Sequence, residues 1–264
     1  MNLQLEGKNV FITGSTAGIG YGVAESMLQE GASVIINGRT NQSVGQAVEQ
    51  LSEKFPEGII SGRRCDFSQV QEVEKLISNM PSVDILINNV GIYTSQSFFD
   101  TSDEDWMRLF EVNVMSGVRL SRALLPQMLG QKWGRIIFIS SECATLVPQD
   151  LIAYSTTKAA ILAISRGLAQ LTKGTQVTVN TVMPGSTMTE GAGQFIERLA
   201  LENDVSKAEA ESDFFEEVRT SSLLQRFASV KEVADTVTYL SSPLSSATNG
   251  AAIKVDGGSM GGII

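Results

Sequence analysis

A tyrosine, a lysine and a serine occupy positions from which they could transfer a proton to a carbonyl oxygen. Tyr154 and Lys158 lie four residues apart at the start of a helical pattern, and Ser141 ends an apolar run thirteen residues before the tyrosine. Residues at i and i+4 share one helix face, so the Lys158 ammonium can lie near the Tyr154 phenol. Ser141 could then hold the carbonyl oxygen beside that phenol.

The lysine matters because a free phenol, with a pKa of about 10, is a poor base at neutral pH. A neighbouring positive charge favours the phenolate, so Lys158 is expected to lower the pKa of Tyr154. Taken alone, the Tyr-x-x-x-Lys spacing also fits a chance pair on a helix surface. The remainder of the sequence decides between these two interpretations.

Glycines near the start of the sequence predict a dinucleotide-binding loop. Residues 8–13 resemble a buried strand, and the spacing T-G-x-x-x-G-x-G follows them directly, before a helical pattern. Glycines at such a turn let the backbone approach a pyrophosphate, which the helix amino terminus binds. A tight turn with incidental glycines is the alternative interpretation. The loop residues expected to bind the cofactor are Gly14, Ser15, Thr16, Gly18, Ile19 and Gly20.

Apolar runs that alternate with helical patterns position these groups. The expected strands are 10–13, 33–37, 59–65, 85–88, 135–140, 177–183 and 252–255, and the expected helices are 18–30, 42–54, 70–79, 103–129, 153–172 and 231–240. Continuous apolar runs are typical of parallel strands covered on both faces, joined by right-handed crossovers. We therefore predict an α/β fold, with residues 1–264 forming one domain around a Rossmann-type, doubly wound parallel sheet of about seven strands.

Composition restricts the function further. The chain has no histidine, and its two cysteines, Cys65 and Cys143, lack the local spacing of metal ligands. We therefore expect no metal site and no mechanism that needs imidazole. A net charge of −9 disfavours nucleic acid as a partner. Because no apolar run is long enough to span a membrane and no leader pattern is present, a cytoplasmic protein is expected.

Together these motifs resemble the short-chain dehydrogenase/reductase family, in its 3-oxoacyl-carrier-protein reductase-like branch, from about residue 5 to residue 258. Asn88-Asn89-Val90-Gly91 matches the family's N-N-A-G with one substitution, and Pro184-Gly185 is followed by Thr189 as in the family. The resemblance implies a catalytic tetrad of Asn113, Ser141, Tyr154 and Lys158. The further cofactor contacts that it implies are Asp66, Phe67, Asn89, Gly91, Tyr154, Lys158, Pro184, Gly185, Thr187 and Thr189.

The implied activity is NAD(P)(H)-dependent interconversion of a carbonyl and a secondary alcohol by hydride transfer. In the family's scheme Tyr154 is the acid or base, Lys158 also binds the nicotinamide ribose, Ser141 orients the carbonyl, and Asn113 holds a water. The pocket mouth is expected at Tyr93, Val147, Gln149 and Leu151. The substrate is a small molecule whose identity, and whose attachment to a carrier, stay open. A sugar-nucleotide epimerase or dehydratase and a non-catalytic dinucleotide sensor are the alternatives.

The residues after the second expected strand favour NADP as the cofactor, with NAD as the alternative. Gly38 stands where members that prefer NAD carry an acid, and Arg39 follows it. A guanidinium can bind a 2′-phosphate through two hydrogen bonds, whereas a carboxylate repels it. Ala17 departs from this pattern, because many relatives that prefer NADP carry a basic residue inside the glycine loop.

One segment, 189–222, interrupts the alternation of strands and helices. It contains two short helical patterns with apolar faces, one at Phe195 and Leu199 and one at Phe214 and Phe215. A long excursion in a small domain is usually functional, and in the resembled family this position carries a substrate lid. We expect the apolar faces to cover the active-site cleft. The family also implies a homotetramer, formed through helices 103–129 and 153–172.

Overall fold

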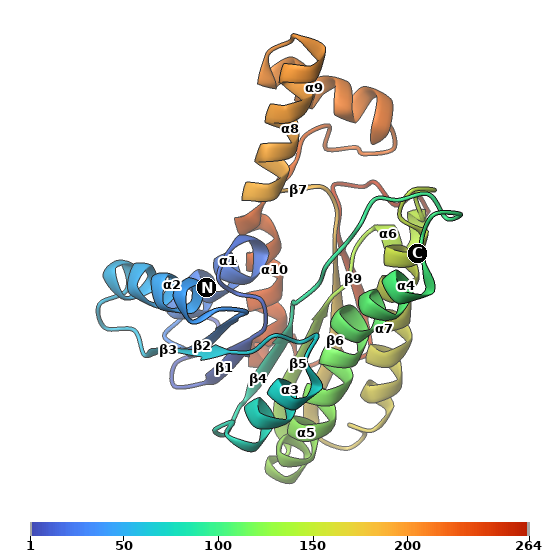
Figure 1. Cartoon of the computed structure of the whole chain (residues 1–264). Helices are drawn as coiled ribbons and strands as arrows, with labels where there is room; N and C mark the ends of the chain where they lie inside the picture. Colours follow the sequence, from blue (N-terminus) through green and yellow to red (C-terminus); the bar gives the residue numbers. More distant parts are fainter. Residues whose placement is uncertain (1, 263–264) are drawn as a thin grey trace.

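Seven parallel strands form the central sheet of the computed structural model, which describes residues 2–262 (Figure 1). Their order is β3-β2-β1-β4-β5-β6-β9, so the chain starts mid-sheet and winds outward in both directions. This confirms the predicted doubly wound α/β fold. The strands are β1 (Asn9–Ile12), β2 (Ser33–Gly38), β3 (Ile60–Arg64), β4 (Ile85–Asn88), β5 (Trp133–Ile139), β6 (Gln176–Pro184) and β9 (Ala252–Val255).

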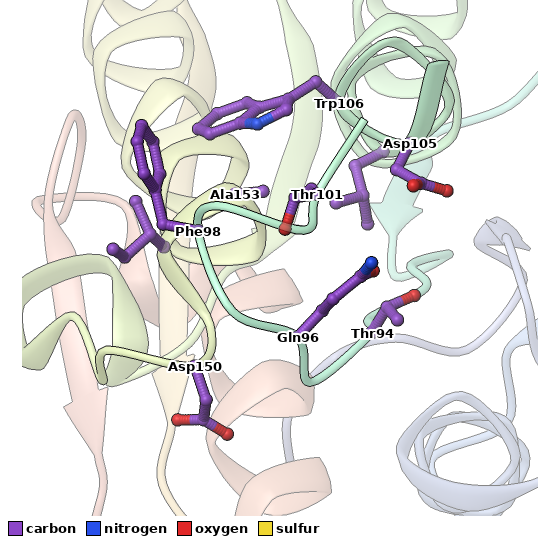
Figure 2. A pocket seen from close by; sticks show the side chains of 10 residues that line it. Thr94, Gln96, Phe98, Thr101, Asp105, Trp106, Asp150 and Ala153 are labelled. Carbon is purple, nitrogen blue, oxygen red and sulfur yellow. The ribbon is translucent and has the colours of Figure 1, made fainter. Parts of the chain in front are cut away.

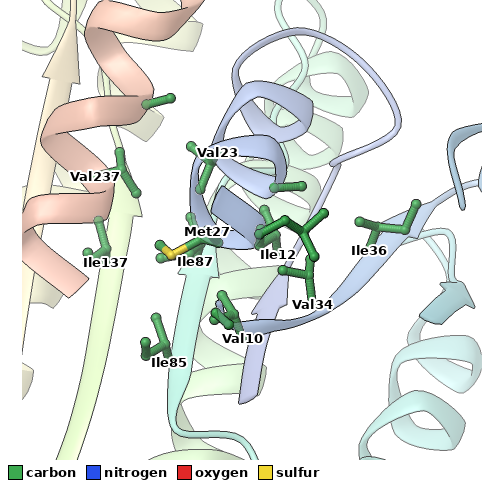
Figure 3. Close-up of a cluster of buried hydrophobic side chains, with 14 of the residues drawn as sticks. Val10, Ile12, Val23, Met27, Val34, Ile36, Ile85, Ile87, Ile137 and Val237 are labelled. Carbon is green, nitrogen blue, oxygen red and sulfur yellow. The ribbon is translucent and has the colours of Figure 1, made fainter. Parts of the chain in front are cut away.

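Helices cover both faces of this sheet, because successive strand residues point to opposite sides. In β1, Val10 and Ile12 pack with Val23 of α1 and Val237 of α10 (Figure 3), whereas Phe11 belongs to the cluster on the opposite face. The first face carries α1 (Gly18–Gln29), α2 (Asn41–Lys54) and α10 (Val230–Ser241), and the second carries α3 (Val70–Ser78), α5 (Ser116–Gln131) and α7 (Ile152–Gln170). None of the described helices is both long enough and apolar enough to cross a lipid bilayer.

The long helix expected at 103–129 is divided by a π-helical turn. It consists of α4 (Asp103–Phe110), the π turn η1 (Glu111–Met115) and α5, which continues to Gln131. A π turn inserts a single extra residue into an otherwise α-helical run, a local shift too small for the apolar periodicity of the sequence to reveal. Asn113 lies inside this turn.

The segment after β6 projects from the body of the domain (Figure 1). Two short strands, β7 (Thr187–Met188) and β8 (Ala228–Ser229), pair in parallel at its base. Between them lie α8 (Glu190–Asn203), α9 (Lys207–Asp213) and the π turn η2 (Phe214–Val218). The remaining short helices are α6 (Cys143–Leu146) and η3 (Pro243–Ser245). Two residues are too few for a periodic signal, so neither short strand was predicted.

The apolar side chains of this segment pack on one another. Phe214 stacks on Phe227 with ring centroids 5.3 Å apart, and Phe195 and Phe215 contact the Phe214 ring edge to face. With Ile196 they belong to a separate hydrophobic cluster. The expectation that these faces cover the active-site cleft is therefore wrong, because the two helical pieces and Phe227 bury one another's apolar side chains.

Candidate active site

A groove lies at the carboxyl ends of β1, β2, β3 and β4, where doubly wound sheets bind their ligands. It brings together predicted cofactor residues from distant parts of the sequence, among them Gly14, Arg39, Asp66 and Asn89. Arg108 of α4 also lines it, although the sequence reasoning did not include this residue. The other lining residues are Thr16, Ala17, Asn37, Gly38, Cys65, Phe67, Ser68, Val90, Gly91, Ile92 and Val112.

The glycine loop at one end of the groove is held by side chains that the motif does not contain. The Gly14 N–H donates to Asn37 Oδ1 (3.0 Å), and the Asn89 amide donates to the Gly14 carbonyl (2.8 Å). A Cβ at Gly20 would lie 2.4 Å from that carbonyl oxygen, so only glycine fits there. Ser15 is buried and fixes the loop to the strands beside it: its hydroxyl donates to the Ile12 carbonyl, and its N–H donates to the Asn37 carbonyl (2.8 Å).

The start of α1 fits the pyrophosphate of a dinucleotide. Ala17 precedes the helix without a side-chain hydrogen bond to it, and the first turn has no acidic residue. The first N–H groups of a helix need an acceptor, and the helix dipole favours an anion there. Ile19, also in this turn, packs partly against the first core cluster.

At the far end of the groove, the neighbouring residues Arg39 and Gly38 differ in exposure. Arg39 is exposed, and among residues 2–262 it has no ion-pair partner within 4.0 Å. Gly38 is buried, and a Cβ there would lie 2.5 Å from Thr16 Cγ2. Across the groove, Asp66 Oδ1 accepts hydrogen bonds from the backbone and hydroxyl of Ser68. Phe67 is buried beside it.

Lys158 and Tyr154 share the first two turns of α7. The Lys158 ammonium lies 5.6 Å from the centre of the Tyr154 ring and donates to the Ile139 carbonyl at the end of β5 (2.9 Å). It is almost fully buried, and burial lowers the pKa of Lys158 to about 8. Gly91 borders the ammonium, since a Cβ there would lie 3.2 Å from Nζ.

The phenol of Tyr154 has its pKa shifted in the direction opposite to the sequence prediction. Burial is the largest cause and raises the pKa, the Cys143 thiol adds to it, and a hydrogen bond with Ser141 opposes it. The predicted lowering of the Tyr154 pKa is therefore wrong, because desolvation by burial is the largest influence on this pKa and raises it. The phenol is therefore protonated at neutral pH.

Ser141 and Asn113 meet this pair from two other elements. Ser141 follows β5, and its hydroxyl accepts from the Cys143 N–H (3.1 Å). Asn113 exchanges two hydrogen bonds with the backbone of Ile92 and donates to the Thr157 hydroxyl (3.0 Å). Thr157 in turn donates to the Tyr154 carbonyl. The π turn therefore ties the loop after β4 to the start of α7.

The segment after β6 approaches the glycine loop, although the lining of the groove does not include its predicted cofactor residues Pro184, Gly185, Thr187 and Thr189. The Gly185 N–H donates to the Val255 carbonyl, and the Thr187 hydroxyl donates to the carbonyl of Gly185 (2.9 Å). Thr189 caps α8, and its Cγ2 lies 3.5 Å from the position of a Cβ on Gly18. Thr189 thus lies beside the glycine loop, and Pro184 lies beside the turn that contains Ser141.

Beside the tetrad, the predicted pocket mouth is only partly assembled. Tyr93 packs edge to face on Tyr154, with ring centroids 6.0 Å apart, and Val147 is half-exposed with a left-handed backbone (φ 44°). Gln149 is exposed, and Leu151, which directly precedes α7, is half-buried. A neighbouring small cavity between residues 94–109 and the start of α7 is lined by polar groups and Trp106 (Figure 2). It has room for about one water molecule, so it is not a substrate site.

Comparisons with known proteins match this geometry. A family model for short chain dehydrogenases covers residues 8–200. The uncharacterized oxidoreductase YvaG of Bacillus subtilis (strain 168) is 47% identical over 258 residues, which cover 98% of each chain. The 3-oxoacyl-(acyl-carrier-protein) reductase FabG of Aquifex aeolicus (strain VF5) is 31% identical over 261 residues. The matched region covers 98% of this chain and 99% of that reductase. L-sorbose reductase from Gluconobacter frateurii, solved with NADPH and L-sorbose, has a TM-score of 0.93 at 29% identity, with both chains covered completely.

Proposed function

The chain belongs to the short-chain dehydrogenase family, in its FabG-like branch, and from this premise we propose how its residues act. It is an NAD(P)-dependent oxidoreductase that interconverts a carbonyl group and an alcohol. One observation carries the assignment of roles: Ser141, Tyr154 and Lys158 converge at the carboxyl end of β5, next to the groove. The substrate is a small molecule, and its carbonyl oxygen lies between Ser141 and Tyr154.

In the reductive direction Tyr154 is the proton donor. A phenol is protonated at neutral pH, and the upward shift of its pKa through burial leaves it so, which makes the proton available for transfer to the alkoxide that forms. Ser141 donates its hydroxyl proton to the carbonyl oxygen and stabilises the negative charge that develops there. Lys158, with a pKa of about 8, can return a proton to the phenol near neutral pH. The bound nicotinamide cofactor supplies the hydride. In oxidation the same groups act in reverse.

We assign NADP to the groove, with NAD as the alternative cofactor. The first helical turn of α1 and the backbone of residues 14–20 receive the pyrophosphate, Asp66 and Phe67 border the adenine, and Asn89, Gly91, Pro184, Gly185, Thr187 and Thr189 surround the nicotinamide half. The exposed and unpaired Arg39 supports NADP, because its guanidinium is free to bind a 2′-phosphate. L-sorbose reductase, which resembles this chain over its whole length, was solved with NADPH.

Three further features belong to this proposal. Within the single domain, residues 189–222 form a substrate lid, an assignment supported by the contact of Thr189 with the glycine loop. The enzyme is a homotetramer, since Phe98 and Phe99 in the loop before α4, and Met107 on α4, expose large apolar surfaces that a second copy could cover. It is cytoplasmic, because its two cysteines are buried as free thiols, as in proteins of a reducing compartment.

Oxidation of NADPH in the presence of a carbonyl panel tests the proposal. The panel contains 2,3-butanedione, ethyl acetoacetate, L-sorbose and acetoacetyl-coenzyme A, so that free ketones, ketoses and thioesters are separated. On the best substrate, Tyr154→Phe is expected to lower kcat at least about a hundredfold, because it removes the transferable proton. Tyr239→Phe, on the half-exposed face of α10, is the matched control. Wild-type turnover by Tyr154→Phe would disprove the proposed acid.

A further inference from the structure

Glu142 is a buried carboxyl group that directly follows Ser141. Only 4% of its side chain is exposed. Its N–H donates to the Pro184 carbonyl (2.8 Å), which fixes the turn after β5 to the end of β6. The next residue, Cys143, donates its N–H to the Ser141 hydroxyl. The backbone that holds Glu142 therefore also holds the hydroxyl proposed to orient the substrate.

The charge opposite Glu142 comes from the lid. Arg219 Nε lies 3.3 Å from Glu142 Oε1, and 19% of the arginine side chain is exposed. The alignment is too poor for a hydrogen bond, so the contact is electrostatic. The guanidinium also lies 5.7 Å from the centre of the Phe214 ring, and the Arg219 N–H closes the η2 turn on the Phe214 carbonyl. Arg219 thus links the lid's hydrophobic cluster to the serine turn.

The loop after β9 encloses the pair on a third side. Leu223 and Leu224, which follow the lid, both donate their N–H groups to the Gly257 carbonyl (2.9 Å). Ser259 lies near the Glu142 carboxyl, but its hydroxyl proton is directed to the Asp256 carbonyl (2.8 Å). Arg219 is therefore the cation that offsets part of the desolvation of Glu142, whose pKa burial still raises, while Asp256 is a second negative charge nearby.

The turn after β5 and the loop after β9 pack closely against Gly185. A Cβ on this glycine would lie 2.8 Å from Glu142 Oε2 and 2.7 Å from Asp256 Cα. Glu142 Oε2 has no hydrogen-bond partner among the described residues. Removal of one partner from a buried ion pair leaves an uncompensated charge, which is more disruptive than removal of both. The carboxylate therefore depends on the guanidinium that the lid supplies.

We propose that Glu142 is a positioning residue and that, through Arg219, it couples the seating of the lid to the orientation of the Ser141 hydroxyl. The proposal rests on the proposed role of Ser141 in orienting the substrate carbonyl. When Arg219 is in place, the turn over residues 141–143 is held in its active arrangement. When the lid withdraws Arg219, the turn loses its counter-charge and the serine loses its position.

A double-mutant cycle on the full chain tests this coupling. Glu142→Gln, Arg219→Gln and the double variant are compared with wild type, using NADPH and the best ketone of the panel above. Each single variant is expected to lower kcat about tenfold, within the range of coupling between residues in contact. KM is expected to change less than kcat, and NADPH affinity is expected to stay within about twofold, because the pair does not line the groove. The double variant is expected to lose no more than the worse single one.

Hydrogen exchange gives a readout that does not need turnover. With NADPH alone, amides of residues 214–224 are expected to exchange faster in Arg219→Gln than in wild type. The matched control is Lys231→Gln, which breaks the exposed ion pair between Lys231 and Asp235 on α10, outside the lid. It is expected to leave both kcat and the exchange rates near residue 219 unchanged. Arg219→Lys keeps the charge and is expected to retain more activity than Arg219→Gln. This variant keeps the proposal testable if Arg219→Gln folds poorly.

Additive effects of the two substitutions would overturn the proposal, as would unchanged exchange in Arg219→Gln. Equal losses in Arg219→Lys and Arg219→Gln would show that the charge is not what positions the serine. Ser141→Ala separates this failure from failure of the proposed function. If Ser141→Ala abolishes turnover while Glu142 and Arg219 act independently, only the coupling is wrong. If Ser141→Ala retains wild-type turnover, the proposed role of the serine itself fails, and the coupling to it fails with it.

Discussion

Burial of Lys158 makes the stability of the folded protein depend on pH. The pKa of this ammonium falls from 10.5 to about 8 on folding, because the group loses its hydration. Between those values the unfolded chain binds more protons than the folded one, so the contribution of Lys158 to stability rises with pH. The cost of burying the charge is full below pH 8 and disappears as pH rises toward 10.5.

The expected magnitude follows from the two pKa values. Between pH 7 and pH 9 the lysine stays protonated in the unfolded chain and loses its proton in the folded one. The free energy of unfolding should then rise by about 1.4 kcal/mol, the equivalent of one pKa unit. Lys158→Met removes the titrating group but keeps an unbranched side chain, so the variant should lack this rise.

Urea denaturation of the cofactor-free protein at pH 7, 8 and 9 gives the measurement, at one protein concentration so that association does not contribute. The quantity of interest is the difference in unfolding free energy between wild type and Lys158→Met at each pH. Lys173→Met, at an exposed position, controls for the loss of one positive charge. A difference that is flat or that falls with pH would refute the argument, because Lys158 would then be solvated or paired in the folded state.

Two other expectations concern the cofactor and the lid. Arg39→Leu should weaken NADPH binding about ten- to a hundredfold and leave NADH binding nearly unchanged, as measured by dissociation constants; a wild type that prefers NADH would contradict this. Gly38 should be left intact in that test, because a Cβ there would meet Thr16. Amides of residues 189–222 should exchange faster without ligand than with NADPH and substrate, and equal protection in both states would identify the segment as fixed scaffold.

Local sequence signals predicted the fold and most of the groove. The glycine loop is recognisable because its spacing is imposed by a single turn between β1 and α1, and the strands are recognisable because each is a short apolar run. The alternation of Val10, Phe11 and Ile12 between the two core clusters follows directly from strand geometry. Such features depend on residues that are close in the sequence, so periodicity and spacing predict them.

Features that depend on distant contacts were missed or predicted wrongly. The π turn at Asn113 is stabilised by Ile92 and Thr157, which lie 21 and 44 residues away. The aromatic residues of the lid pack on Phe227, which lies beyond the expected end of the segment, instead of over the cleft. Glu142 and Arg219 are 77 positions apart, and nothing in either local sequence marks them as a pair.

The pKa shifts of Tyr154 and Lys158 have one cause and two chemical consequences. Desolvation disfavours charge on either group, so the phenol keeps its proton and the lysine can lose one near neutral pH. A forming alkoxide is a stronger base than a phenolate, so Tyr154 can still protonate it, and the Lys158 ammonium can replace that proton. Oxidation needs the Tyr154 phenolate, so another charge or hydrogen bond must stabilise that phenolate. The Ser141 hydroxyl already lowers the pKa of Tyr154 in this way, so the orientation of that hydroxyl bears on the proton transfer as well as on the placement of the carbonyl.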